Sequence, residues 1–233
     1  MRKLIFITLC ILIQSCNSQT TKKEEEKKPL ISKPPMETKK NNSKKLLDLT
    51  NLKFKTRIDE ILSRIGLTLN DNALNEYNIS GDYDEFKFTP RQINLFGNNI
   101  DFEKNETSFF YNKKDKLVWC YEINILDNDD ALKIIKIFEN KYGAKPAFSK
   151  ISLSTKEHPL FLDENGEFKK DKMEQRILVW EDLKEKATFF LIYKVNYDTK
   201  PVEGSLQIIA IDKDNKKYKD WVSYRSLDMY YKN

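Results

Sequence analysis

Residues 107–126, "TSFFYNKKDKLVWCYEINIL", decide the fold class of this chain of 233 residues. Two runs rich in aromatic and β-branched residues flank a polar stretch from Asn112 to Asp115, which predicts a β-hairpin. Alternate residues of the second run should point to opposite faces of a sheet. The expected core face carries Leu117, Trp119, Tyr121, Ile123 and Ile125, and the expected mixed face carries Val118, Cys120, Glu122 and Asn124.

The hairpin is followed by residues 127–146, "DNDDALKIIKIFENKYGAKP", in which apolar residues recur at helical spacing. Asp127 or Asn128 is suited to cap the helix, and the acidic residues that follow favour its positive end. Gly143 and Pro146 should end it. The expected buried stripe consists of Leu132, Ile135, Phe138 and Tyr142.

The rest of the chain continues this pattern of hairpins and isolated helices. A helix is expected from about residue 56 to Gly66, and another near residues 221–231, where Trp221, Tyr224, Leu227 and Tyr231 recur at helical intervals. Strands are expected at 85–89, 92–104 (two short strands around Gly97-Asn98-Asn99), 147–154, 175–182, 187–196 and 204–212. The order predicts one α+β domain over residues 44–233, a mostly antiparallel sheet built from hairpins with two or three helices packed on one side.

The chain begins "MRKLIFITLCILIQSC" (1–16), which is a basic start followed by an apolar block from Leu4 to Ile13. As a helix this block would be ~15 Å long, about half of the ~30 Å hydrocarbon core of a bilayer. It is too short to span a membrane permanently. A basic start, a short apolar block and a small residue before a cut site are typical of a secretory signal peptide.

Ile13-Gln14-Ser15-Cys16 resembles the lipobox of bacterial lipoproteins. The resemblance implies that residues 1–15 are a cleaved signal peptide and that Cys16 becomes the lipidated first residue, carrying a diacylglyceryl group and a further fatty acid such as palmitate. Asn17 stands where an aspartate keeps many such proteins in the inner membrane, so the resemblance favours the outer membrane. The hairpin followed by a helix ending in "KYG" (141–143) also resembles small envelope lipoproteins of unassigned function, a likeness that implies no active site.

Residues 16–43 are expected to form a lipidated, disordered tether, because they contain almost no residues able to build a core. Within it, "KKEEEKK" (22–28) admits two interpretations. An acidic cluster shortly after the lipidated cysteine resembles the signal that exports some lipoproteins to the outer face of the outer membrane. Mixed charge also simply keeps a linker solvated, and the sequence leaves both interpretations open, so the periplasmic or surface face is not decided.

The distribution of charge excludes a nucleic-acid binding function for the domain. The whole chain has 41 basic and 36 acidic residues, but residues 46–233 hold 30 basic and 32 acidic ones. Binding to phosphate backbones requires a concentrated positive face. The basic surplus lies in the tether, which is suited to an anionic lipid surface.

Residue types that usually carry catalysis are scarce. Cys120 is the single cysteine of the domain, so no intradomain disulfide is possible, and on a strand it is expected to be a small buried hydrophobe. His158, the one histidine, is expected in a solvated loop with no zinc-ligand spacing around it. Neither a phosphate-binding loop nor a nucleophile elbow is present. "DENGEF" (163–168) and "DKDNKK" (212–217) imitate calcium loops but fit turns better.

These observations predict no cofactor, no metal and no catalytic residue. The favoured function is a non-enzymatic, membrane-anchored cell-envelope lipoprotein that binds a protein or envelope partner. One alternative is a surface glycan-binding module using exposed aromatic residues, for which Trp180 and Trp221 are the candidates. Another is a carboxylate-based hydrolase, which would need two acidic residues converging in a cleft.

Overall fold

The computed structural model describes residues 46–49, 52–74, 81–101, 105–162 and 164–228, except for the side chains of 158–161. All of them belong to one compact unit, Asn41–Asn233. The predicted signal peptide, the tether and Cys16 lie outside the described residues. In the part that is described, no helix has the length and apolar character needed to cross a bilayer.

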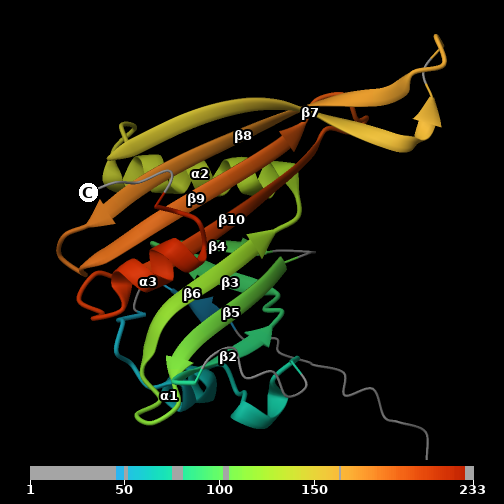
Figure 1. Ribbon diagram of the computed structural model, residues 1–233. Coiled ribbons are helices and arrows are strands. Elements are labelled where there is room, and N and C mark those ends of the chain that lie inside the picture. Colours follow the sequence, from blue (N-terminus) through green and yellow to red (C-terminus); the bar gives the residue numbers. More distant parts are fainter. Residues whose placement is uncertain (1–45, 50–51, 75–80, 102–104, 163, 229–233) are drawn as a thin grey trace, which may run out of the picture. The chain divides into compact units, whose positions relative to one another are not determined.

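The fold is α+β, as predicted (Figure 1). The helices are α1 (Ile58–Arg64), the short 3-10 helix η1 (Leu69–Asp71), α2 (Asn128–Tyr142) and α3 (Tyr218–Tyr224). The strands are β1 (Leu47–Asp48), β2 (Tyr83–Phe88), β3 (Gln92–Leu95), β4 (Asn98–Asp101), β5 (Asn105–Asn112), β6 (Val118–Ile125), β7 (Phe148–Leu162), β8 (Phe168–Asp182), β9 (Ala187–Asn196) and β10 (Glu203–Asp212).

Among the described residues, seven strands form the main sheet in the order β2-β5-β6-β10-β9-β8-β7, and every neighbouring pair is antiparallel. Most neighbours are joined by hairpins, whereas β10 returns to the middle of the sheet and pairs with β6. A smaller sheet has the order β1-β3-β4, with β1 parallel to β3 and β3 antiparallel to β4. The prediction of a mostly antiparallel, hairpin-built sheet is therefore confirmed.

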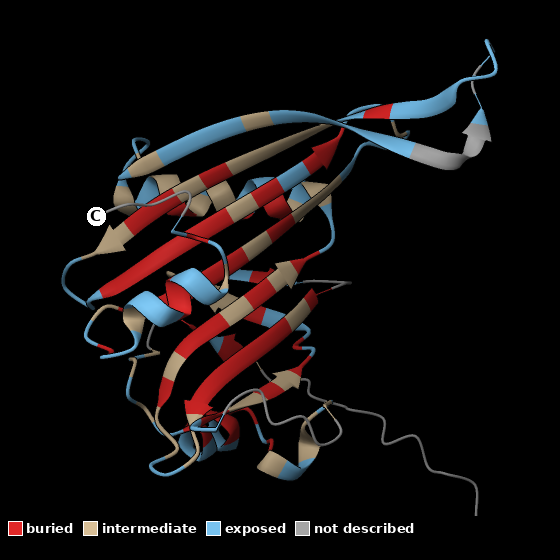
Figure 2. Ribbon diagram, viewed as in Figure 1, coloured by how far each residue is buried: buried red, intermediate tan, exposed pale blue. Residues whose placement is uncertain are grey.

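Buried residues occupy the central strands of the main sheet (Figure 2), and apolar side chains form a cluster on each of its faces. One face packs on α1 and α2, through residues such as Ile61, Ile134 and Phe138. The other face packs on α3, through Trp221 and Val222. Two helices thus share one side, as predicted, and the third covers the opposite side because the central strands are apolar on both faces.

The rotation of α2 about its axis differs from the prediction. Asp127 caps the helix by accepting a 2.9 Å hydrogen bond from the backbone N–H of Asp130. The buried residues are Ala131, Ile134 and Phe138, whereas Leu132, expected in the stripe, is 45% exposed. Several rotations of this apolar helix satisfy its spacing, so its contacts with the sheet decide among them.

One of those contacts holds the first turn of α2. The hydroxyl of Tyr193 on β9 donates a 2.6 Å hydrogen bond to Oδ1 of Asn128. Asn128 reaches this position because Gly204 on β10 has no side chain: a Cβ there would lie 2.2 Å from the same oxygen. Asn128 therefore attaches the helix to the sheet, while Asp127 is the cap.

Strand β6 departs from strict alternation next to Trp119. Tyr111 pairs with Val118 while Phe110 pairs with Cys120, so Trp119 is an extra residue in a β-bulge. Trp119 consequently packs, partly buried, against the cluster on the α3 side, together with Cys120. The prediction that Trp119 shares the core face of Tyr121 was wrong, because the bulge reverses the alternation at this point.

The β7–β8 hairpin is much longer than predicted and projects beyond the rest of the sheet (Figure 1). Expected strands at 147–154 and 175–182 extend to 148–162 and 168–182. His158 therefore lies in β7, and not in a loop as predicted. The polar runs 155–158 and 169–172 hid the full length of these strands, because strand patterns are recognised by apolar residues on a buried face.

Candidate functional site

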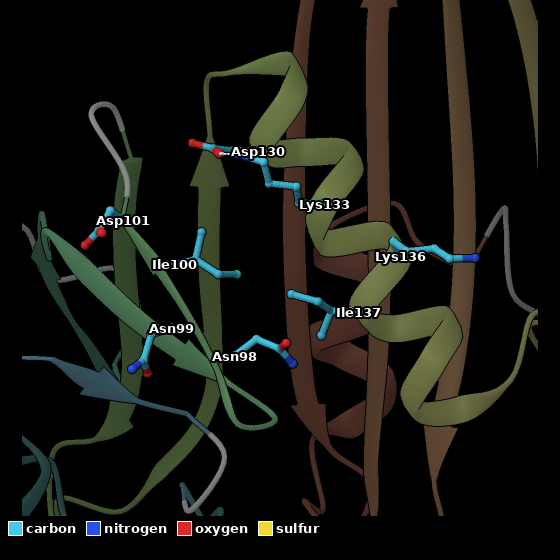
Figure 3. A pocket seen from close by; sticks show the side chains of 8 residues that line it. All are labelled: Asn98, Asn99, Ile100, Asp101, Asp130, Lys133, Lys136 and Ile137. Atoms are coloured by element: carbon cyan, nitrogen blue, oxygen red, sulfur yellow. Dashed lines mark hydrogen bonds and ion pairs between the residues drawn. The ribbon is translucent and has the colours of Figure 1, made fainter.

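The described part of the chain has an open groove of about 540 Å³ between β4 and α2 (Figure 3). Its volume lies within the range of small-ligand sites. Strand β4 and helix α2 contribute equally to its lining, which consists of Asn98, Asn99, Ile100, Asp101, Asp130, Lys133, Lys136 and Ile137.

Apolar side chains from both elements meet in the groove. Figure 3 shows Asn98 and Ile100 extending from β4 towards α2, and Ile137 extending from α2 towards β4. Ile100 is only 8% exposed, and Ile137 is partly buried against the main core. The groove therefore has an apolar floor and a polar amide, Asn98, at its wall.

The charged residues of the groove largely neutralise one another. Lys133 lies 2.9 Å from the Asp130 carboxylate, and Lys136 lies 3.1 Å from that of Glu139. Asp101 is exposed. With paired charges, contact with a ligand would depend on shape, backbone hydrogen bonds and the apolar floor more than on long-range attraction.

The turn between β3 and β4 holds one end of the groove against α2. Phe96 and Gly97 form it with φ angles of 51° and 82°, a conformation that is costly for a bulky residue such as phenylalanine. The Phe96 ring lies 5.3 Å from that of Phe138 and 5.4 Å from that of Tyr142. This packing offsets the strain. The sequence placed the turn at Gly97 to Asn99, but Asn98 already belongs to β4.

The tryptophans proposed as a sugar-binding platform are core residues. Trp180 is 2% exposed, lies 5.6 Å from the Phe138 ring and donates a 3.1 Å hydrogen bond to the carbonyl of Gly143. Trp221 is 8% exposed and packs edge-on against Tyr83 at 5.0 Å. Stacking on a sugar requires an open ring face. The alternative of a glycan-binding module required Trp180 and Trp221 to be exposed, and both are buried.

Two carboxylates come together beside a second, smaller cavity of about 160 Å³ at the end of β10. Lys55 Nζ lies 3.7 Å from Asp212 and 3.4 Å from Asp214. Burial raises the pKa of Asp212, whereas the hydrogen bond from Lys186 lowers the pKa of Asp214. Divergent pKa values are typical of acid–base pairs.

The local geometry nevertheless fits a structural turn. Asp212 Oδ1 accepts a hydrogen bond from the backbone N–H of Asp214, and Lys186 lies 2.8 Å from Asp214 Oδ2. Lys55 and Lys186 thus hold both carboxylates in ion pairs, and the cavity is smaller than the usual range of small-ligand sites. Nothing in this arrangement directs the pair at a substrate.

Other side chains singled out from the sequence do not join the groove. Among the described residues, His, Cys, Asp and Glu form no group of three suited to a metal ion. Residues 164–167 form the turn between β7 and β8 in the "DENGEF" segment, while Asp163 lies outside the described residues. Cys120 is fully buried in the cluster on the α3 side.

Cys120 should resist thiol reagents for as long as the domain is folded. Burial raises the pKa of its thiol to about 12, which lowers the thiolate fraction about a thousandfold relative to an ordinary cysteine. We expect mass spectrometry to find the Cys120 peptide unlabelled by iodoacetamide at pH 8 in native buffer and fully labelled in urea. Rapid labelling of the native protein would contradict the buried placement.

No family model, no curated protein and no solved structure matches this chain.

Proposed function

We propose that this chain is a lipid-anchored protein of the bacterial cell envelope that binds an extended segment of a partner protein in the groove between β4 and α2. The anchor follows from the lipobox-like residues ending at Cys16. The binding function follows from the groove, and each part has its own test.

The observation that carries the binding function is the position of β4 at the edge of its sheet, facing a helix. Within the described residues, β4 pairs with β3 alone. An edge strand offers backbone N–H and C=O groups on its outer side, and an extended peptide can add to it as a further strand. Ile100 and Ile137 then provide an apolar floor for alternate side chains of the peptide.

A peptide fits the groove better than a glycan does. No aromatic residue is among the eight that line it, and the candidate tryptophans are buried elsewhere. Sugar rings are commonly held by stacking on aromatic faces, whereas strand addition uses backbone groups and apolar pockets.

The peptide site is tested by filling the groove. Asn98 is exposed and extends towards α2 (Figure 3), so the bulky ring in Asn98→Trp should obstruct the site without disturbing the core. Peptides selected on the purified protein from a displayed random library should bind this variant at least about tenfold more weakly, a loss of about 1.4 kcal/mol, in fluorescence anisotropy.

Gln92→Trp is the matched control, because Gln92 is exposed on β3 and does not line the groove. Its affinity for the selected peptides should equal that of the parent. A library that yields no binder, or binders indifferent to Asn98→Trp, would refute the peptide site. If peptidoglycan fragments bind the parent protein and Asn98→Trp weakens that binding, the groove would instead be a glycan site.

The anchor is tested by metabolic labelling. A lipoprotein carries two or three acyl chains, and two membrane-binding signals are enough for stable anchoring. Labelled palmitate should therefore be incorporated into the parent protein and lost in Cys16→Ala, which should leave the membrane fraction. Acyl-free native protein in the culture fluid would contradict the anchor and leave the groove unaffected.

A further inference from the structure

The two edge strands of the main sheet, β2 and β7, differ in how far their outer backbone groups are covered. At one end, the backbone of β2 is covered: Asn72 Nδ2 donates to the carbonyl of Glu85 at 2.8 Å, and Asn72 Oδ1 accepts from the N–H of Lys87 at 2.9 Å. The N–H of Ala73 adds a 2.9 Å bond to the carbonyl of Lys87. At the other end lies β7, which among the described residues pairs with β8 alone.

The outer edge of strand β7 is regular enough to pair with another strand. Its register with β8 runs without a shift from Phe148 to Glu157, so the outer edge of this stretch is regular. Natural edge strands are usually protected by charged side chains, especially lysine, by prolines, by bulges or by inward-pointing charges. Residues 148–157 contain no proline and no register shift, and their charged residues are Lys150, Lys156 and Glu157.

This stretch also presents apolar side chains to solvent. Ile151 is 59% exposed and Leu153 is 79% exposed. They stand two residues apart and therefore share one face of the strand. Apolar residues of this size on a regular sheet edge indicate an interaction surface.

We propose that β7 pairs antiparallel with β7 of a second copy of this chain, about a two-fold axis at Ser152. The sequence of the strand is self-complementary in this register. Ile151 lies opposite Leu153 of the second copy, and by symmetry Leu153 lies opposite its Ile151, so four apolar side chains meet on one face. Ser149 lies opposite Thr155, and Lys150 lies opposite Ser154.

Neighbouring registers are less favourable. An axis at Leu153 would place Lys150 opposite Lys156 twice, and directly opposed like charges destabilise a sheet. An axis at Ile151 would place Leu153 opposite Ser149 and leave the apolar residues mismatched. A two-fold axis that passes between two residues is excluded. In an antiparallel pair, directly opposed residues lie on the same face of the sheet, and the symmetry satisfies this only when the axis passes through a residue. The axis at Ser152 joins the two main sheets into one.

A cysteine at position 152 tests both the pairing and its register. Residues on the two-fold axis face each other at Cα separations of about 4.5–5.5 Å, which suits a disulfide. Ser154→Cys is the matched control: in this register the two copies of residue 154 are offset by four residues, about 13 Å. The only other cysteine of the domain, Cys120, is buried.

The experiment uses the full chain in unfractionated cell lysate, oxidised with copper phenanthroline and detected on a non-reducing gel, so that it does not depend on the lipid anchor. We expect Ser152→Cys to shift to a disulfide-linked dimer, while Ser154→Cys and the parent stay monomeric. Adding Leu153→Lys to Ser152→Cys should abolish the dimer without unfolding, since Leu153 is largely exposed. The parent reveals any cross-linking through Cys16.

Three outcomes would overturn the proposal. Ser152→Cys could yield no more dimer than the parent, Ser154→Cys could cross-link as well as Ser152→Cys, or the adduct could contain a different protein. The pairing does not depend on the peptide groove, which lies at β4, so either site can fail without the other.

Discussion

Arg225→Ala should lower the free energy of unfolding by about 3–5 kcal/mol, because removing one partner of a buried ion pair leaves the other charge uncompensated. The Arg225 side chain is 8% exposed, and its Nε bonds to Glu122, whose side chain is 15% exposed. Urea denaturation followed by tryptophan fluorescence measures the loss.

The aromatic residues around Arg225 explain why its removal should lower the free energy of unfolding more than most single substitutions do. The centre of the guanidinium lies 4.7 Å from the ring centroids of both Phe110 and Trp221. Arg225 directly follows α3, so its contacts with β5 and β6 hold that helix on the sheet. Losing them removes cation–π attraction and packing together with the ion pair.

Two variants separate the buried charge from packing. Arg225→Met with Glu122→Gln removes both charges while retaining volume, and it should recover much of the stability lost in Arg225→Ala. Arg64→Ala breaks an ion pair whose side chains are 56% and 53% exposed, and should change little. If Arg225→Ala lowers the free energy of unfolding as little as Arg64→Ala does, the buried ion pair of Arg225 with Glu122 is refuted.

Phe138→Ala should also destabilise the protein by about 3–5 kcal/mol, the usual cost of emptying an aromatic site in a core. Phe138 is fully buried in the middle of α2. Its ring lies 5.3 Å from that of Phe189 and 5.6 Å from that of Trp180. It also contacts Phe96 of the β3–β4 turn, so the loss should loosen the groove. Thermal unfolding monitored by circular dichroism provides the measurement.

Leu132→Ala on the same helix is the matched control. Leu132 is 45% exposed, so its truncation should cost less than about 1 kcal/mol, as surface substitutions usually do. This pair of variants also distinguishes the two rotations of α2. If the stripe expected from the sequence were the buried one, Leu132→Ala would be severe as well.

Much of the fold could be predicted locally. Strands β9 and β10 and helix α2 are marked by strong apolar patterns and by capping residues, and they appear where expected. Local patterns failed where tertiary contacts made the choice. The bulge at Trp119 reverses a regular alternation, and the polar runs 155–158 and 169–172 in β7 and β8 carry no apolar signature of a strand.

The candidate groove could not be predicted from residues 98–101. "NNID" is typical of a turn followed by a short strand, and nothing in it indicates a ligand. The groove exists because Phe96 packs against Phe138 and Tyr142, which sets β4 beside a helix about 30 residues further along the chain. Conversely, Trp180 and Trp221 stood out in the sequence, but their burial could be decided only by the elements packed over them.

The sequence by itself determined the α+β class and the hairpin order, because the spacing of apolar residues and the residue types that favour turns can be recognised in short stretches of chain. It also determined the expectation of a lipidated Cys16, which rests on four adjacent residues. Only the tertiary structure decided which side of α2 is buried, which aromatic residues are covered and where the groove lies. Each of those depends on contacts between residues far apart in the chain, and such contacts follow from packing whole elements together.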